Sequence, residues 1–156
     1  MTTQIDVGVR PPDFDLPATS GKTVRLSALK GRKIVLYFYP KDDTTGCTAE
    51  AIAFNGLKEK FRQAGTHILG VSPDSPASHA KFARKHRLDL ELASDESKAM
   101  LQAYGVWVEK SMYGRKYMGV ERTTLLIDAK GIVAHVWRKV KTPGHAEEVL
   151  KAAQAL

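Results

Sequence analysis

The chain has 156 residues, of which 43% are hydrophobic and 26% charged, with a formal net charge of +7. These values are typical of a soluble globular protein, and the length fits one domain over residues 1–156. No apolar run approaches the roughly 20 residues that span a bilayer, so we expect no membrane association. The positive charges are scattered and show no zinc-finger or recognition-helix pattern, which argues against nucleic-acid binding.

The start of the chain and its cysteine content predict the compartment. The opening MTTQIDVGVRPPDF has no basic region followed by an apolar one, so we predict no secretory signal. Cys47 is the one cysteine and cannot form an intramolecular disulfide. Both observations favour a reducing, cytoplasmic location.

The first half of the chain predicts a hairpin, two buried strands and a helix. Residues 11–29 alternate around the turn Ser20-Gly21-Lys22, as in a short hairpin. Residues 33–39 (KIVLYFY) form a continuous apolar run after Lys33, as in a strand covered on both faces, and residues 67–72 (HILGVS) predict another buried strand. Between them, apolar residues at helical spacing predict a helix from about 48 to 63.

The second half predicts three helices, a short strand and a hairpin. Ser75 and Pro76 begin a helix that reaches about His86, and residues 90–92 form a short strand. Ser94 or Asp95 caps a helix that ends at Tyr104. The remaining elements are two strands, 123–128 and 132–136, joined by a turn, and a helix over 145–155. This order implies an α/β fold with a mixed central sheet flanked by helices.

Cys47 lies in the stretch YPKDDTTGC, directly after a buried strand and at the start of a predicted helix. Unpaired N–H groups and the dipole at a helix N-terminus favour an anion, and a thiol reacts as its thiolate. Pro40 ends the strand, Gly46 relieves backbone crowding, and Thr44 can point a hydroxyl at the sulfur or at a substrate oxygen. We therefore expect a reactive thiol at the rim of a strand-loop-helix shelf.

Two alternatives concern the same stretch. Free cysteines are commonly buried and inert, so Cys47 could be a small core residue. The loop residues Lys41, Asp42 and Asp43 are expected to face solvent. A Pro, Gly and Thr-rich loop that opens a helix favours the reactive thiol.

At these residues the sequence resembles the peroxiredoxins, and within them the bacterioferritin comigratory protein group, also called peroxiredoxin Q. The family pattern of Pro, three residues, Thr, two residues and Cys stands here as Pro40, Thr44 and Cys47. Residues 109–128 (EKSMYGRKYMGVERTTLLID) resemble a later segment of the group that carries an arginine, here Arg122, and PPDF at 11–14 resembles its N-terminal entry. The resemblance covers nearly the whole chain and implies a thioredoxin-like fold.

The resemblance also implies a thiol-dependent peroxidase and gives each residue a role. Cys47 would attack the terminal oxygen of hydrogen peroxide or an organic hydroperoxide and become a sulfenic acid. Arg122 would stabilise the thiolate and polarise the peroxide, Thr44 would hydrogen-bond the substrate oxygens, and Pro40 would shield the sulfenate. Gly46 and Thr48 match the flanks of the motif. Glu50 matches too, and either orients Arg122 or faces the helix dipole.

Two departures from the group matter for the reaction cycle. Many members carry a resolving cysteine where this chain has Ile52, and the segment HAKFARKHRL, where others place it, has none. The sulfenate must then be reduced by an external thiol such as thioredoxin or glutaredoxin with glutathione, and Cys47 is left more open to overoxidation. Thr45 replaces a proline often found before Gly46, which implies a less rigid loop. The resemblance implies a monomer.

Other functions have less support in the sequence. The histidines lack paired ligand spacing, and no phosphate-binding glycine motif occurs, so we expect neither a metal nor another cofactor. Trp107, Tyr113 and Tyr117 lie among basic residues that could clamp single-stranded nucleic acid, but we interpret this segment as a loop packed beside the thiol. A redox-signalling module that forms mixed disulfides with partner proteins is the alternative to a peroxidase.

Overall fold

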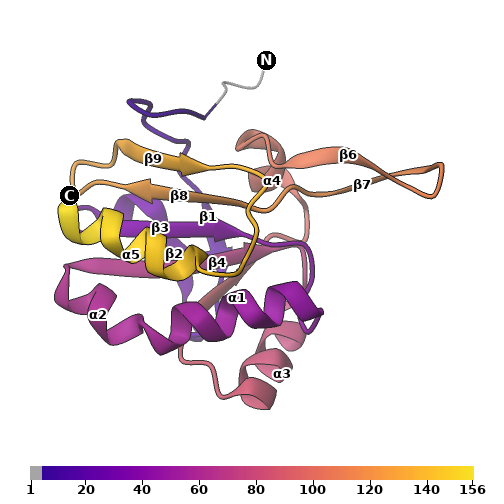
Figure 1. Ribbon diagram of the computed structural model, residues 1–156, viewed down its shortest axis with the longest axis horizontal. Coiled ribbons are helices and arrows are strands. Elements are labelled where there is room, and N and C mark those ends of the chain that lie inside the picture. The colour runs from indigo at the N-terminus through magenta and orange to yellow at the C-terminus, as the bar shows by residue number, and fades with distance from the viewer. Residues whose placement is uncertain (1–4) are drawn as a thin grey trace.

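A five-stranded mixed sheet forms the centre of the computed structural model, which describes residues 5–156. Its strands, in spatial order, are β5 (Glu91–Ser94), β4 (Thr66–Ser72), β3 (Lys33–Phe38), β8 (Thr123–Ile127) and β9 (Val133–Trp137) (Figure 1). β3 pairs in parallel with β4 and antiparallel with β8, which makes the sheet mixed, as predicted. Residues 1–4, which begin the segment where we predicted no secretory signal, lie outside the described residues.

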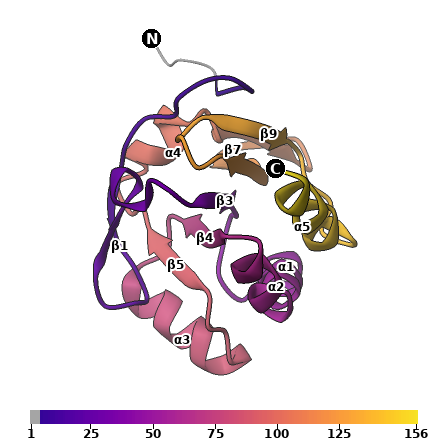
Figure 2. The ribbon, with the colours of Figure 1, turned by 90° about the vertical axis from the view of Figure 1, so that its left-hand side faces the viewer.

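Helices and a hairpin cover the two faces of this sheet. The other elements are β1 (Asp15–Pro17), β2 (Thr23–Arg25), the 3-10 helix Leu26–Leu29, α1 (Thr45–Gly56), α2 (Lys58–Gln63), α3 (Pro76–His86), α4 (Ala99–Ala103), β6 (Trp107–Met112), β7 (Arg115–Val120) and α5 (His145–Ala155). Figure 2 shows α1, α2 and α5 on one side of the sheet, and β1 and α4 on the other. None of the described helices is long and apolar enough to cross a bilayer.

The sequence of β3 explains why the sheet is buried on both faces. Ile34, Leu36 and Phe38 point into a core shared with the β1–β2 hairpin and α4. Val35 and Tyr37 point into a second core, shared with α1, α2, α3 and α5, and none of these five residues is more than 2% exposed. The continuous apolar run is therefore typical of a central strand, which is covered on both faces.

Several predicted elements are confirmed. The N-terminal hairpin forms, and α3 and α5 have the bounds expected from the sequence. Ser75 caps α3, where its Oγ accepts a hydrogen bond from the Ser78 N–H at 3.1 Å. The strands of the β8–β9 hairpin are displaced by about one residue at their ends from the predicted ranges.

The helix predicted over 48–63 is wrong in two respects. α1 begins at Thr45, and the helical segment is interrupted at Leu57, whose backbone dihedrals are −102° and 3°. Gly56 ends α1 because glycine loses more backbone entropy in a helix than other residues do. The earlier start moves Cys47 from the helix boundary into its first turn.

The helix predicted from Ser94 or Asp95 to Tyr104 is shorter than expected. Ser94 belongs to β5, and a turn separates it from α4, which begins at Ala99 after the left-handed Lys98 (φ 65°). The Asp95 carboxylate still acts on this helix, because it accepts a hydrogen bond from the Leu101 N–H at 2.8 Å.

The segment interpreted as a loop beside the thiol is instead the hairpin β6–β7. Its turn is Tyr113-Gly114, and both residues have positive φ angles of 52° and 77°, the arrangement of a two-residue hairpin turn. Most of its residues are exposed, so the hydrophobic alternation that identifies a strand is weak. In Figure 1 the hairpin extends away from the sheet, beyond the end of β3 that leads to α1.

Candidate active site

Cys47 lies in the first turn of α1, on the chain that leaves the end of β3. Thr44 is extended (φ −87°, ψ 157°) and precedes the helix, whose first backbone hydrogen bond runs from the Thr48 N–H to the Thr44 carbonyl at 2.8 Å. The N–H groups of the first turn have no acceptor one turn earlier in the helix, so they give this end a partial positive charge. The structure therefore places the thiol where an anion is favoured.

The thiol is buried. The predicted position at the exposed rim of a shelf is therefore wrong. Cys47 is 1% exposed and belongs to the core that α1 forms with Tyr37 and Tyr39. Cys47 lies on the buried face of α1, together with Glu50, Ala51 and Phe54. Burial by itself fits an inert core thiol, so its polar neighbours decide between the two interpretations.

Arg122 is the polar neighbour of the thiol. Its Nη2 donates to Cys47 Sγ at 3.2 Å, and its Nη1 donates to Glu50 Oε1 at 2.6 Å. Arg122 lies between β7 and β8, so the fold joins residues 75 positions apart in the chain. A guanidinium presents several donors in one plane, and here it contacts a sulfur and a carboxylate together. An inert core thiol would not account for this cation.

Glu50 holds Arg122 from inside the core. The Glu50 side chain is 1% exposed, and its burial raises the pKa of the carboxyl from 4.5 to about 7, although Arg122 acts in the opposite direction. Burial would lower the pKa of Arg122, but the neighbouring Glu50 and Cys47 outweigh it, and that pKa is raised. Glu50 is thus a weaker acid than an ordinary glutamate, and it holds the guanidinium against the sulfur.

The other residues of the sequence motif have distinct positions. A Cβ on Gly46 would lie 3.3 Å from Arg122 Nη2, so the glycine leaves room for the guanidinium. The Thr44 hydroxyl donates to the Lys41 carbonyl at 2.9 Å and does not contact the sulfur in this structure. Pro40 and Thr48 are half-buried on the two sides of the loop.

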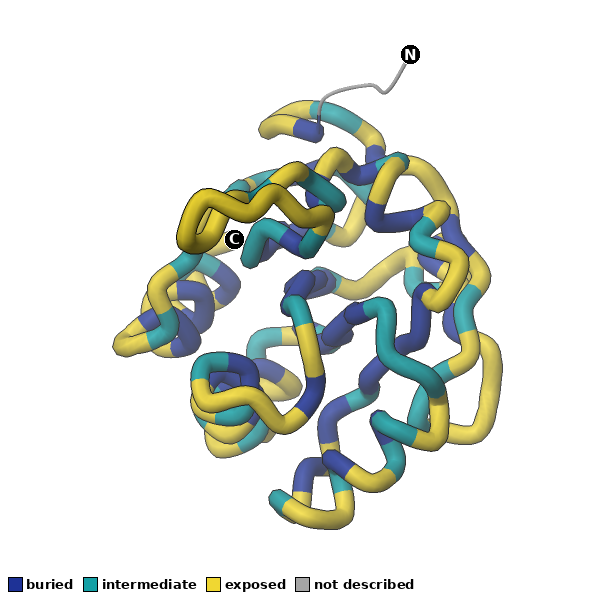
Figure 3. Tube along the Cα trace, turned by 90° about the vertical axis from the view of Figure 1, so that its right-hand side faces the viewer, coloured by how far each residue is buried: buried dark blue, intermediate teal, exposed yellow. Residues whose placement is uncertain are grey.

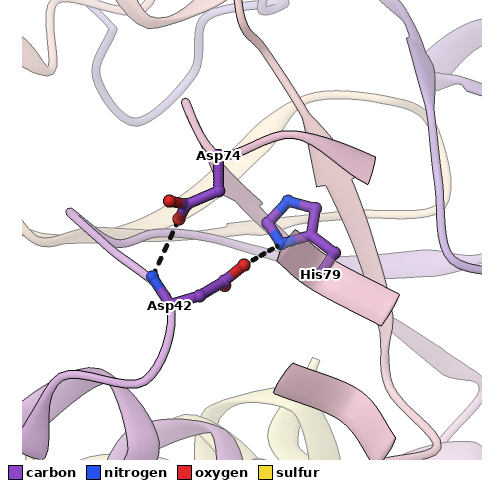
Figure 4. A group of neighbouring side chains, drawn as sticks. All are labelled: Asp42, Asp74 and His79. Atoms are coloured by element: carbon purple, nitrogen blue, oxygen red, sulfur yellow. Dashed lines mark hydrogen bonds and ion pairs between the residues drawn. The ribbon is translucent and has the colours of Figure 1, made fainter. Parts of the chain in front are cut away.

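Asp42 was expected to face solvent, and this expectation is wrong. Its side chain is 4% exposed, and its Oδ2 accepts from His79 Nδ1 at 2.7 Å (Figure 4). The same carboxylate accepts from the Tyr39 hydroxyl at 2.6 Å and the Ser78 hydroxyl at 2.8 Å. These hydrogen bonds join the loop before Cys47 to α3, and they explain why an aspartate is buried there. Lys41 and Asp43 are exposed, as predicted.

Further contacts tie the same loop to the rest of the molecule. The backbone N–H of Asp42 donates to Asp74 Oδ2 at 2.8 Å (Figure 4). On the outside of the loop, Asp43 pairs with Lys85 at 2.6 Å and with His86 at 2.8 Å, and these two hydrogen bonds lower its pKa. The loop that precedes the thiol is thus fixed to α3 from its buried and its exposed side.

Asp42, Asp74 and His79 bring potential metal-ligand atoms within 4.8 Å of one another, a grouping that sequence spacing did not predict. The geometry favours a hydrogen-bond network. His79 Nδ1 faces the Asp42 carboxylate, and its Nε2 faces the Ala93 carbonyl at 3.0 Å, so both nitrogens have acceptors. Each polar atom of this histidine therefore already has a protein partner, as in a structural hydrogen-bond network. The sequence offered one signal for this buried histidine, its spacing of three residues from Phe82 on α3.

Comparisons with known proteins give the family. Residues 7–136 match the AhpC/TSA family model. The chain belongs to the AhpC/TSA family. It is 46% identical to peroxiredoxin Bcp of Bacillus subtilis (strain 168), over 94% of each chain, and 40% identical to peroxiredoxin Bcp of Escherichia coli (strain K12), over 89% of each. These relatives place it in the Bcp, or peroxiredoxin Q, group and confirm the resemblance in its motifs.

Solved structures of this group confirm the fold. The bacterioferritin comigratory protein of Xanthomonas campestris, studied for its alkyl peroxide reduction activity, is 42% identical with a TM-score of 0.89, and the match covers 97% of this chain and 96% of that one. The peroxidoxin BcpB of Mycobacterium tuberculosis is 34% identical with a TM-score of 0.86, covering 98% and 99%. The thioredoxin-like fold is thus confirmed, and this peroxiredoxin is a thiol-dependent peroxidase.

Proposed function

We propose that Cys47 is the peroxidatic cysteine and that Arg122 activates it. The observation that carries the proposal is the 3.2 Å contact between Arg122 Nη2 and Cys47 Sγ, in a site where Glu50 holds the guanidinium. A fixed cation in a water-poor site stabilises the thiolate and the negative charge that grows on the peroxide oxygens. Gly46 and Thr48 have supporting positions in the same turn.

The reaction proceeds by displacement on oxygen. The Cys47 thiolate attacks the terminal oxygen of the hydroperoxide, the O–O bond breaks, and the leaving oxygen takes a proton to become water or an alcohol. Cys47 is left as a sulfenic acid. Arg122 donates hydrogen bonds to the substrate oxygens. The Thr44 hydroxyl does the same after it turns away from the Lys41 carbonyl, and Pro40 limits the access of water to the sulfenic acid.

The substrates are hydrogen peroxide and organic hydroperoxides. In support, a relative of this chain is studied for alkyl peroxide reduction. Because Cys47 is the one cysteine of the chain, the sulfenic acid is reduced by an external thiol, such as thioredoxin or glutaredoxin with glutathione. The protein works as a monomer in a reducing compartment such as the cytoplasm, which supplies those thiols.

Mass spectrometry of the intact protein tests this function. One equivalent of hydrogen peroxide should add a single oxygen to Cys47 within seconds, and a sulfenic-acid trap should capture it. Arg122→Lys should slow this oxidation by about 100-fold, because an ammonium cannot contact the sulfur and Glu50 in one plane. Arg115→Lys, on the exposed part of β7, is the matched control and should react like the wild type. An unmodified Cys47 in the wild type would refute the proposal.

A further inference from the structure

The β6–β7 hairpin carries most of the exposed apolar side chains in the described part of the chain. Of seven large apolar residues that are exposed there, four lie on this hairpin: Met112 (56%), Tyr113 (98%), Tyr117 (44%) and Met118 (49%). Figure 1 shows the hairpin extending beyond the sheet, and Figure 3 shows exposed residues along much of its length. Neighbouring apolar side chains in water mark an interaction surface.

One face of the hairpin combines apolar and basic groups. The register pairs Lys110 with Tyr117 and Met112 with Arg115, and paired residues of two strands share a face. Carbons of Lys110 and Tyr117 each lie 3.4 Å from where a Cβ of Gly119 would be, so both side chains lie over that glycine. We call Lys110, Met112, Arg115 and Tyr117 the basic face.

The basic face lies on the thiol's side of the molecule. Trp107 and Val120, from the opposite face, pack into the core that does not contain Cys47. Arg122, whose Nη2 lies 3.2 Å from Cys47 Sγ, follows the end of β7 by two residues, so the base of the hairpin lies beside the thiol. The pKa of Lys110 is lowered, first by burial and then by Arg122, while Cys47 acts in the opposite direction. A molecule that covers the basic face is thus adjacent to the thiol.

The charges and shape of the basic face indicate its partner. The four residues of this face include two cations, Lys110 and Arg115. Glu109 lies on the opposite face, where its Oε1 is 3.7 Å from Lys116 Nζ, and Glu121, which acts on Lys110, lies beyond the end of β7. A basic surface with aromatic and Met side chains favours an acidic protein surface. Small molecules bind in hollows, whereas this face stands on a projecting hairpin.

We propose that the basic face docks the reductant of oxidised Cys47, a protein with a reactive dithiol set in an acidic surface. This inference rests on the proposed function, in which an external thiol completes the cycle. The partner's thiolate attacks the Cys47 sulfur, the S–O bond breaks, and the hydroxide leaves with a proton as water. The partner's second thiol then attacks the partner sulfur of this mixed disulfide and releases the Cys47 thiolate.

Charge reversal on the two faces tests the proposal. Thioredoxin with its reductase, and glutaredoxin with glutathione, are used as protein reductants, and dithiothreitol as a small one. For the better protein reductant, the double variant Lys110→Glu/Arg115→Glu should raise the KM by about tenfold, and the wild-type rate should fall as salt rises. Lys116→Glu reverses one charge on the opposite face and is the matched control for the single variant Arg115→Glu, which should raise the KM by about threefold. Lys116→Glu should alter the KM by less than about twofold.

Comparing dithiothreitol with the protein reductants distinguishes two outcomes: that the docking proposal is wrong, and that the chain is not a peroxidase. A wild type that consumes no peroxide with dithiothreitol would remove the proposed function itself. If dithiothreitol supports turnover, docking is refuted when Arg115→Glu and Lys116→Glu have equal effects. It is also refuted when neither protein reduces Cys47 faster per thiol than dithiothreitol, or when the basic face proves to bind a second copy of the chain in sedimentation experiments.

Discussion

Asp42 and His79 form a buried pair, with Oδ2 and Nδ1 2.7 Å apart and side chains that are 4% and 1% exposed. Asp42 lies on the loop before the thiol, and His79 lies on α3, 37 positions later. The Tyr39 hydroxyl, at the end of the central strand, donates to the same carboxylate. The loop that carries Thr44 and leads to Cys47 is therefore held in place by hydrogen bonds to residues outside the Pro, Thr and Cys motif.

We expect Asp42→Asn to destabilise the protein by about 3 kcal/mol, since it replaces a buried carboxylate that accepts hydrogen bonds from Tyr39 and Ser78 and faces His79. The folded variant should also react more slowly with peroxide, because the loop loses its attachment to α3. Urea unfolding and stopped-flow oxidation of Cys47 measure the two effects. Asp43→Asn, at the exposed neighbour, is the control and should change stability by less than about 1 kcal/mol. Equal losses in both variants would show that the network has no special role.

Gly46→Ala tests the space beside Arg122. The new Cβ would lie 3.3 Å from Nη2, so the guanidinium should move by a few tenths of an ångström from the sulfur. We expect peroxide oxidation to slow by about tenfold, with little change in the melting temperature. Gly56→Ala, where a Cβ would meet no atom within 4 Å, is the matched control and should keep the wild-type rate. A Gly46→Ala variant that reacts at the wild-type rate would show that the reaction does not depend on the position of the Arg122 guanidinium relative to the sulfur.

Glu50 should make the stability depend on pH. Its folded pKa of about 7 lies above the ordinary value of 4.5, so folding favours the protonated carboxyl. This contribution is fully present below pH 4.5 and is lost as the pH rises through 7. Glu50→Gln should remove it, so the stability of the wild type relative to the variant should fall by about 3 kcal/mol across this range.

Urea unfolding at several pH values measures that difference. Glu147→Gln, at an exposed carboxyl in the first turn of α5, is the control and should follow the wild type. A Glu50→Gln curve parallel to the wild type would contradict this prediction, because it would show that the pKa of Glu50 is the same in the folded and the unfolded chain.

Ile52→Cys should give the chain an internal resolving thiol. Five residues of helix separate the two positions by about 7.5 Å along the axis, beyond the usual span of a disulfide. Ile52 is also 49% exposed, whereas Cys47 is buried. After peroxide treatment we expect a monomer lighter by two hydrogens, together with a loss of helical circular dichroism as the start of α1 unwinds. Ile52→Ser is the control. A disulfide formed without loss of helix, or only between chains, would contradict this prediction.

Much of the fold follows from local patterns. The buried run of β3 and the capped helix α3 have strong periodic or capping signals, and the structure has them where the sequence predicts them. The β6–β7 hairpin lacks such a signal because it buries little and mixes polar and apolar residues on both of its faces. The break at Leu57 has no strong signal either, since a single Gly56 is tolerated in many helices.

The site residues likewise fall into those that local sequence predicts and those that only the fold brings together. The stretch around Cys47 indicates a reactive thiol because helix start, glycine and loop are adjacent in sequence. Arg122 and Glu50 meet through pairing of distant strands and helices, and only the family resemblance linked the arginine to the thiol before the structure did. Asp42 was misjudged because its partners on α3 lie 36 and 37 positions away, beyond the reach of any local pattern.

The interruption at Leu57 separates α1 from α2 as hydrogen-bonded units. Opening of one therefore does not require opening of the other, because the ladder of backbone hydrogen bonds is not continuous across it. Amide hydrogen exchange in the turns after Cys47 should report a free energy of opening different from that of α2, whose Phe61 is anchored in the core. Phe54 anchors α1 in the same core, so we expect the segment that bears the thiol to open as a small cooperative unit only when this side chain leaves its place.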